Sequence, residues 1–178
     1  MAGKLSPSIA PKAENALQTL HLEHEGERLL TLQQAAISLR IYGLPGAQGS
    51  KRHVGRGVMV ESSKKVKPWR ADVTAASIAA YQGPIIEAAV SMSIVFLFAR
   101  PKGHMGKRGL KPSAPRHLTS QATGDLDKLC RSTLDGLSAG AGGSPLRDDS
   151  LVVSLTASPR DGVGDERPGA LITLIPLQ

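Results

Sequence analysis

The chain reads Asp125-Leu-Asp-Lys-Leu-Cys-Arg-Ser-Thr-Leu-Asp-Gly-Leu137 where its clearest helical pattern begins. Mostly apolar residues recur there at the spacing of one helix face. They are Leu126, Leu129, Cys130, Thr133, Leu134 and Leu137. Two acids, Asp125 and Asp127, stand where the preceding loop enters this pattern. The stretch therefore predicts an amphipathic helix with a pair of carboxylates at its N-terminal end.

Strand patterns surround this helix, and a second helical pattern precedes it. In chain order we expect a strand at 37–43, a short strand at 58–61, a helix at 68–81, a long strand at 85–99, the helix above, and closing strands at 151–156 and 170–177. Ser62 and Ser63 are expected to cap the first helix, with Pro68 at its start. This order predicts an α+β fold, a single small domain in which two main helices cover one face of a mixed β-sheet.

Length and composition limit the class of protein. The chain has 178 residues, which is enough for one core, and a hydrophobic content of 40%. Residues 1–35 contain breaks at Pro7, Pro11 and Gly26, so we expect a flexible or weakly helical extension before a domain at 36–178. Cys130 is the single cysteine, which excludes an intramolecular disulfide and a zinc cluster built on thiolates. With no apolar run long enough for a bilayer, we expect a cytoplasmic protein.

Charge is distributed unevenly along the chain. Residues 36–124 hold 14 Lys or Arg against 3 Asp or Glu, whereas residues 125–178 hold 5 against 8. A basic excess that is confined to one segment is typical of a surface that binds a polyanion. The alternative is a solvated cationic surface kept for solubility. The residues expected to hold DNA backbones are Lys51, Arg52, Lys64, Lys65, Lys67, Arg70, Lys107, Arg108, Lys111 and Lys128.

A second pair of acids, Asp148 and Asp149, opens the strand that follows a Gly-rich turn. It can therefore return to the end of the sheet where Asp125 and Asp127 stand. Clustered carboxylates repel one another unless a cation lies between them, and Mg²⁺ with oxygen ligands meets that need. Taken singly, such acids are often only helix caps or turn residues. Taken with the basic segment, they predict a divalent-metal site that hydrolyses a phosphodiester bond.

Arg131 lies one helical turn after Asp127 and shares a face with Asp135. It is expected to brace the carboxylates or to stabilise charge on the scissile phosphate. The alternative is a surface ion pair, worth less than ~1 kcal/mol.

Three motifs together resemble the RusA family of Holliday-junction resolvases, including its phage-borne members. They are Asp125-Leu-Asp-Lys-Leu129 with Leu134-Asp-Gly-Leu137, Arg147-Asp-Asp-Ser-Leu-Val152, and the early block Pro45-Gly-Ala-Gln-Gly-Ser-Lys-Arg52, which is followed by Lys67-Pro-Trp-Arg70. The resemblance runs from about residue 37 to the C-terminus.

The resemblance implies a homodimeric, Mg²⁺-dependent endonuclease, with Mn²⁺ as a substitute, that nicks four-way DNA junctions symmetrically in recombination and repair. It implies that the metal is held by Asp125, Asp127 and Asp149, with Asp148 beside them. The family often has Lys where this chain has Arg131. Arg does not readily give up a proton, so charge stabilisation is expected there rather than acid catalysis.

Two other functions stay open at this point. One is a broader nuclease for branched DNA such as flaps, and the other is a structure-specific DNA-binding module without catalysis. Aromatic residues make up only 3% of the chain, which argues against a platform of stacked bases. The expected partner is therefore branched DNA with duplex arms, and neither a membrane nor a small-molecule cofactor is expected.

Overall fold

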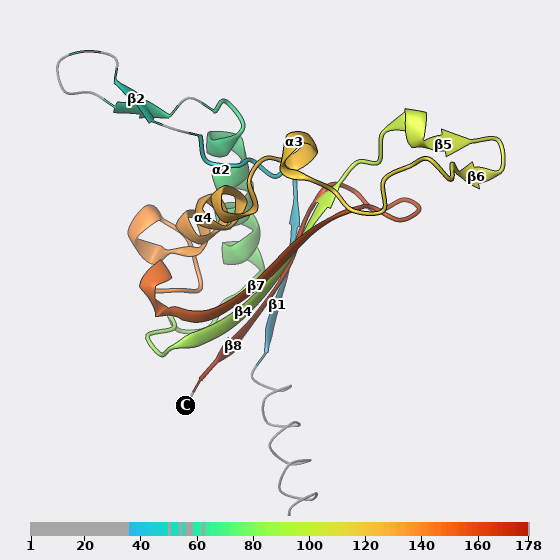
Figure 1. Ribbon diagram of the computed structural model, residues 1–178. Coiled ribbons are helices and arrows are strands. Elements are labelled where there is room, and N and C mark those ends of the chain that lie inside the picture. Colours follow the sequence, from blue (N-terminus) through green and yellow to red (C-terminus); the bar gives the residue numbers. More distant parts are fainter. Residues whose placement is uncertain (1–35, 50, 54, 56–58, 62, 178) are drawn as a thin grey trace, which may run out of the picture. The chain divides into compact units, whose positions relative to one another are not determined.

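Four strands form the main sheet, in the order β1–β8–β4–β7 (Figure 1). This computed structural model describes residues 36–49, 51–53, 55, 59–61 and 63–177, so the predicted extension at 1–35 lies outside the described residues. Strand β8 pairs antiparallel with β1 and β4, and β4 pairs parallel with β7. The bounds are β1 Ile37–Tyr42, β4 Val90–Phe98, β7 Val152–Asp161 and β8 Gly169–Pro176. The mixed sheet was predicted, and it is confirmed.

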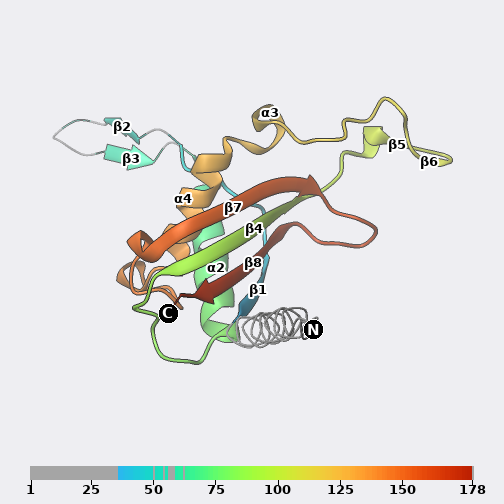
Figure 2. The ribbon, with the colours of Figure 1, turned by 60° about the horizontal axis from the view of Figure 1, so that its bottom comes forward.

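Two helices, α2 (Val66–Ala80) and α4 (Leu126–Leu137), cover one face of this sheet. Figure 2 shows the other face of the sheet free of both helices. Alternate residues of β4, namely Val90, Met92, Ile94 and Phe96, are buried in the core with the inward residues of β1 and β8. Alternation with period two places them on the helix side, as the sequence predicts. The α+β architecture is therefore the expected one.

The two helices are fixed to each other by a buried polar contact and by a small residue. Trp69 Nε1 donates to Thr133 Oγ1 at 3.0 Å, and both side chains are fully buried. Gly136 lies so close to α2 that an added Cβ would meet Val73 at 2.9 Å. Thr74 Oγ1 also donates to the Gly136 carbonyl at 3.0 Å. These contacts set where α4, and hence its acidic end, lies over the sheet.

The start of α2 differs from the prediction. The helix begins at Val66, and its cap residue is Lys65, whose side chain makes no capping hydrogen bond. The helix is therefore capped at Lys65 rather than at Ser63, and Ser62 lies outside the described residues. Pro68 lies within the first turn, where the missing N–H of proline is tolerated. The buried face of α2 is Val66, Trp69, Val73 and Ser77, whereas Ile78 is 46% exposed.

The long strand is shorter than predicted, and the predicted loops contain small elements. Strand β4 begins at Val90 rather than at residue 85, because Ile86 makes an isolated bridge with Leu146. The remaining elements are a hairpin of β2 (Lys51–His53) and β3 (Met59–Glu61), a hairpin of β5 (Met105–Gly106) and β6 (Gly109–Leu110), the short helix α3 (Ser120–Thr123), and the 3-10 turns η1 (Lys102–His104), η2 (Ala139–Ala141) and η3 (Asp149–Leu151). Within the part of the chain that is described, no helix has the length and apolarity that a membrane crossing requires.

Candidate active site

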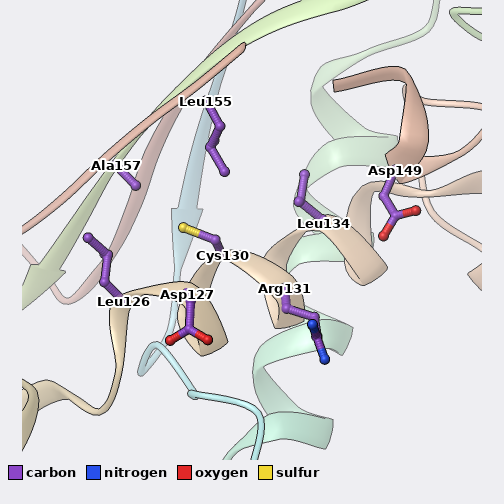
Figure 3. Close-up of a pocket in the computed structure, with 8 residues that line it drawn as sticks. All are labelled: Leu126, Asp127, Cys130, Arg131, Leu134, Asp149, Leu155 and Ala157. Atoms are coloured by element: carbon purple, nitrogen blue, oxygen red, sulfur yellow. The ribbon is translucent and has the colours of Figure 1, made fainter. Parts of the chain in front are cut away.

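Asp127 and Asp149 come from different elements but line the same pocket, which has a volume of about 560 Å³ (Figure 3). The pocket lies between α4 and the start of β7, and Arg131 also lines it. Its other walls are apolar side chains: Leu126, Cys130 and Leu134 from α4, and Leu155 and Ala157 from β7. In the view of Figure 3, the Arg131 side chain lies between the two carboxylates. The structure thus places two of the predicted acids and the predicted arginine around one apolar pocket.

Asp127 is positioned by the way the chain enters α4. Gly124 has a φ of +85°, a conformation that favours glycine, and Asp125 is the extended cap residue. The Asp125 carbonyl accepts the first helical hydrogen bond from Leu129 N at 3.0 Å. Asp127 therefore lies in the first turn, where the positive end of the helix dipole stabilises a carboxylate. That stabilisation does not require a pairing side chain.

The loop that follows β1 is hydrogen-bonded to the first two turns of α4. Gln48 N donates to the Lys128 carbonyl at 3.1 Å, and Ser132 Oγ donates to the Gly46 carbonyl at 2.6 Å. Gly46 in turn touches the start of α2, since an added Cβ would meet the Lys65 carbonyl at 2.5 Å. The loop that contains Gly46 and Gln48 therefore stabilises the acidic N-terminal end of α4.

Asp149 is brought to the pocket by hydrogen bonds that close the Gly-rich connection after α4. Buried Leu146 donates from its N–H to the Leu137 carbonyl at 3.2 Å and accepts from Ala139 N at 2.8 Å. The chain then meets the residues before β4, where Arg147 N donates to the Ile86 carbonyl at 3.0 Å. With Leu146 fixed against the end of α4, the turn η3 and its Asp149 begin beside that helix.

Asp125 and Asp148 do not line the pocket. Asp125 forms an ion pair with Lys128 at 2.6 Å, and this contact raises the pKa of the lysine. The exposed Asp148 caps η3 by accepting a hydrogen bond from Ser150 N at 3.0 Å, and its bonds to Ser150 lower its pKa. No group of three His, Cys, Asp or Glu arranged to hold a metal is found among the described residues.

The two pocket carboxylates nevertheless suit a hard cation. Neither Asp127 nor Asp149 makes an ion pair within the described part of the chain. Mg²⁺ is commonly held by one or two carboxylates, retained waters and substrate phosphate oxygens, so two aspartates are a sufficient protein contribution. The donor chemistry of the pocket therefore fits a divalent cation of this kind.

The pKa of Cys130 reflects the burial of its side chain and the negative charge in the pocket. Its side chain is only 7% exposed, and burial raises the pKa of the thiol, to which the negative charge of Asp127 adds. A thiol with a raised pKa is a poor nucleophile and a poor metal ligand at neutral pH. We therefore assign Cys130 to the apolar wall, and the oxygen ligands remain the reactive groups.

The acidic residue nearest the C-terminal end of α4 forms an ion pair with α2. Asp135, which shares a helix face with Arg131, forms an ion pair with Arg70 of α2. Arg70 was predicted to hold DNA, but its side chain is 33% exposed and already paired. The Arg70–Asp135 pair joins the two helices, and neither residue lines the pocket.

Of the other predicted DNA contacts, Lys128 is paired with Asp125, six residues are exposed on two elements, and two are not described. Lys64, Lys65 and Lys67 are exposed at the start of α2, and Lys107, Arg108 and Lys111 are exposed on the β5–β6 hairpin. Lys51 and Arg52 belong to β2, but their side chains lie outside what the structure describes. Figures 1 and 2 show the β2–β3 and β5–β6 hairpins on either side of α3 and the start of α4. Basic elements therefore flank the acidic pocket.

Sequence reasoning missed the β7 wall of the pocket. Leu155 and Ala157 alternate along an edge strand, and Leu155 is 42% exposed. The signal was present in the alternation Val153, Leu155, Ala157. An apolar row on an edge strand indicates a surface that contacts something more than its own sheet.

Comparison with known proteins agrees with these observations. The family model described as endodeoxyribonuclease RusA matches residues 43–175, which include both acidic motifs and the basic elements beside them. No individual curated protein matches the chain. The match covers most of the chain and confirms the resemblance seen in its motifs. The chain therefore belongs to the RusA family of endodeoxyribonucleases, hydrolases that act on DNA.

Proposed function

We propose that this protein is a Mg²⁺-dependent endonuclease that cuts branched DNA and resolves Holliday junctions by paired, symmetric nicks. The observation that carries the proposal is the pocket between α4 and β7. Asp127, Arg131 and Asp149 line it, and neither acid has an ion pair among the described residues. Unpaired carboxylates beside basic elements are suited to a cation and a phosphate together.

Asp127 and Asp149 would hold the cation. Asp125 lies two residues before Asp127, and Asp148 lies next to Asp149. Both would complete the ligand set by a change of side-chain rotamer. The Asp125–Lys128 pair is open to solvent, which screens its attraction, so little is lost when it breaks. When bound, a divalent cation supplies a coordinated water of lowered pKa and neutralises charge on the phosphate.

Arg131 would act on the phosphate rather than on a proton. A guanidinium does not readily release a proton, so Arg131 is not suited to act as a general acid. It lines the pocket with Asp127 and Asp149, where the scissile phosphate would lie. Stabilisation of the negative charge that develops in the transition state is the role open to it.

The basic elements would hold the duplex arms of the substrate. Exposed lysines at the start of α2 and on the β5–β6 hairpin lie on the elements around the pocket. Binding through phosphates should weaken steeply as salt rises. A two-fold homodimer would present two pockets to a nearly symmetric junction, which accounts for paired nicks. We assign this activity to the cytoplasm of a bacterial cell, including one that carries a phage.

The test is cleavage of a synthetic four-way junction with and without Mg²⁺, repeated with Mn²⁺. Wild-type protein should cut only with the metal, and Asp127→Asn should lose activity by several factors of ten, each about 1.4 kcal/mol of barrier. Asp135→Asn is the matched control, because it removes the same charge from the same helix outside the pocket.

Each other outcome points to a different function. If Asp127→Asn cuts as well as wild type, the assigned site is wrong. If neither protein cuts but both bind the junction, the chain is a DNA-binding module. Flap and fork substrates in the same assay separate a junction resolvase from a broader nuclease for branched DNA.

A further inference from the structure

Two arginines lie against one tyrosine ring on the face of the sheet that α2 and α4 leave uncovered. Tyr42 ends β1 and is 50% exposed. The Arg40 guanidinium carbon lies 4.5 Å from the centre of its ring, and that of Arg167 lies 4.8 Å from it. Arg40 and Tyr42 alternate with the buried Leu39 and Ile41, so they point away from the helices. We call this group the Arg40–Tyr42–Arg167 cluster.

The fold holds Arg40 in a fixed position. Its Nη1 donates to the Ile41 carbonyl at 2.7 Å and to the Ala170 carbonyl at 3.3 Å, and its Nη2 donates to the Arg167 carbonyl at 2.6 Å. Tyr42 is paired across the strands with Gly169, where an added Cβ would come within 2.8 Å of Arg40 Nη1. Glycine at this position thus leaves the space that the guanidinium occupies. A long cationic side chain fixed in this way loses little entropy when it binds a ligand.

The arginines of the cluster have no acidic partner. Neither Arg40 nor Arg167 forms an ion pair with any residue that the structure describes. The nearby carboxylate of Glu166 accepts from Arg160 at 2.6 and 2.9 Å and from Val163 N at 2.8 Å. Arg160 is the main cause that lowers the Glu166 pKa to about 2, and the charge of Arg40 is the smallest contribution. The guanidinium groups of Arg40 and Arg167 therefore lie against one ring, and neither is paired with a carboxylate among the described residues.

We propose that the Arg40–Tyr42–Arg167 cluster binds backbone phosphates of a duplex arm of the DNA substrate, outside the basic elements that flank the pocket. This inference rests on the proposed function. A planar guanidinium presents its donors in a fork that matches phosphate oxygens. The Arg167 side chain is exposed and makes no hydrogen bond to the described residues, so its donors are available. Because guanidinium groups already lie against the Tyr42 ring, the ring orients the arginines and is not a stacking surface for a base.

The cluster is close enough to the pocket to touch the same DNA molecule. Tyr42 is followed by the loop whose Gln48 N–H binds the Lys128 carbonyl on α4, next to Asp127. Six residues of chain span at most about 20 Å. Along one DNA strand that length corresponds to about six nucleotides at ~3.4 Å each. A duplex arm leaving the pocket around the end of the sheet would therefore pass the cluster.

The test is the salt dependence of four-way-junction binding, measured without divalent metal so that no cutting interferes. Each phosphate contact contributes ~0.9 to the slope of log affinity against log salt. Arg167→Ala should lower the slope by about 1 and weaken binding roughly tenfold at ~0.1 M salt. Arg167→Lys should keep the slope because it keeps the charge. Arg147→Ala is the charge-matched control, because its guanidinium is already paired with Glu87, and its slope should equal that of wild type.

The proposal is overturned if Arg167→Ala binds with the wild-type slope. If that variant also cuts the junction normally, the nuclease function stands while the cluster does not. If the wild-type protein binds no DNA, both fail. A titration of the arginine Nε–H NMR signals distinguishes the source of the phosphate. A short duplex should shift the signals of Arg40 and Arg167, and an equal shift with inorganic phosphate at the same concentration would mark a free-anion site instead.

Discussion

The two faces of the β-sheet differ in the charged groups that lie on them without an ion pair. On the helix-covered face, Asp127 and Asp149 line a pocket with Arg131, and neither acid has an ion pair among the described residues. On the uncovered face, Arg40 and Arg167 meet at Tyr42 without a carboxylate partner in the same part of the chain. Other charges are paired within the fold, as at Arg70–Asp135 and Arg100–Asp161.

The difference between the faces indicates which kind of ligand would stabilise the charges on each face. Carboxylates that gather without a counter-ion gain most from a metal cation, and guanidinium groups that gather without one gain most from phosphate. The paired charges, by contrast, are satisfied within the fold. Charges that the fold leaves unpaired are therefore the better guide to function than charge density alone.

The largest expected effect is a loss of cleavage without a loss of DNA binding, which distinguishes the role of the pocket from that of the opposite face. Asp149→Asn should reduce cleavage of a four-way junction by at least about a hundredfold, because ligand carboxylates control a step that depends on metal. Binding without metal should stay the same or tighten, since a negative charge near the DNA is removed. Parallel cleavage and gel-shift measurements check both. If binding and cleavage by the variant fall by the same factor, Asp149 contributes to DNA binding rather than to catalysis.

A second prediction concerns stability, which should depend on the covered face. Trp69→Ala removes a fully buried side chain and its hydrogen bond to Thr133, so unfolding should be easier by about 3–5 kcal/mol. Leu171→Ala, on the uncovered face, removes a side chain that is 38% exposed and should cost about 1 kcal/mol or less. Urea unfolding measures both. Equal losses would mean that the uncovered face is buried against something in solution.

The smallest predicted effect is a pH dependence that arises in the loop between β7 and β8. The pKa of Glu166 in the fold is about 2, below its ordinary 4.5, chiefly because of its bond with Arg160. A lowered folded-state pKa means that the stabilisation is present above pH 4.5 and is lost as the pH falls towards 2. The difference in unfolding free energy between wild type and Glu166→Gln should thus shrink over that interval and stay constant from pH 5 to 8. A difference that stays constant down to pH 2 would show that the pair contributes nothing.

Much of the fold was predictable because its strongest patterns are local. The helix at residues 126–137 was predicted within a residue, since its apolar spacing and its Gly-rich end agree. Strand β7 continues to Asp161, five residues beyond the prediction, because its pairing with β4 continues through Pro159. Proline is accepted on an edge strand, and that edge position is a property of the sheet order rather than of the local sequence.

The candidate site was predictable only in part. Its acids stand in recognisable motifs, and the structure places Asp127 and Asp149 in one pocket. The pairing of Arg70 with Asp135 could not be predicted, because it depends on how α2 crosses α4. The Arg40–Tyr42–Arg167 cluster depends likewise on the register that places Tyr42 opposite Gly169. Contacts between distant segments are set by packing, which a single sequence does not display.

Metal binding tests the central claim most directly. Mn²⁺ can be titrated into the protein without DNA and followed by electron paramagnetic resonance, which counts free ions. Wild type and Asp135→Asn should bind the metal equally, whereas Asp127→Asn and Asp149→Asn should each bind it at least about tenfold more weakly. Equal binding by all four proteins would contradict the assignment of the pocket between α4 and β7 as the metal site.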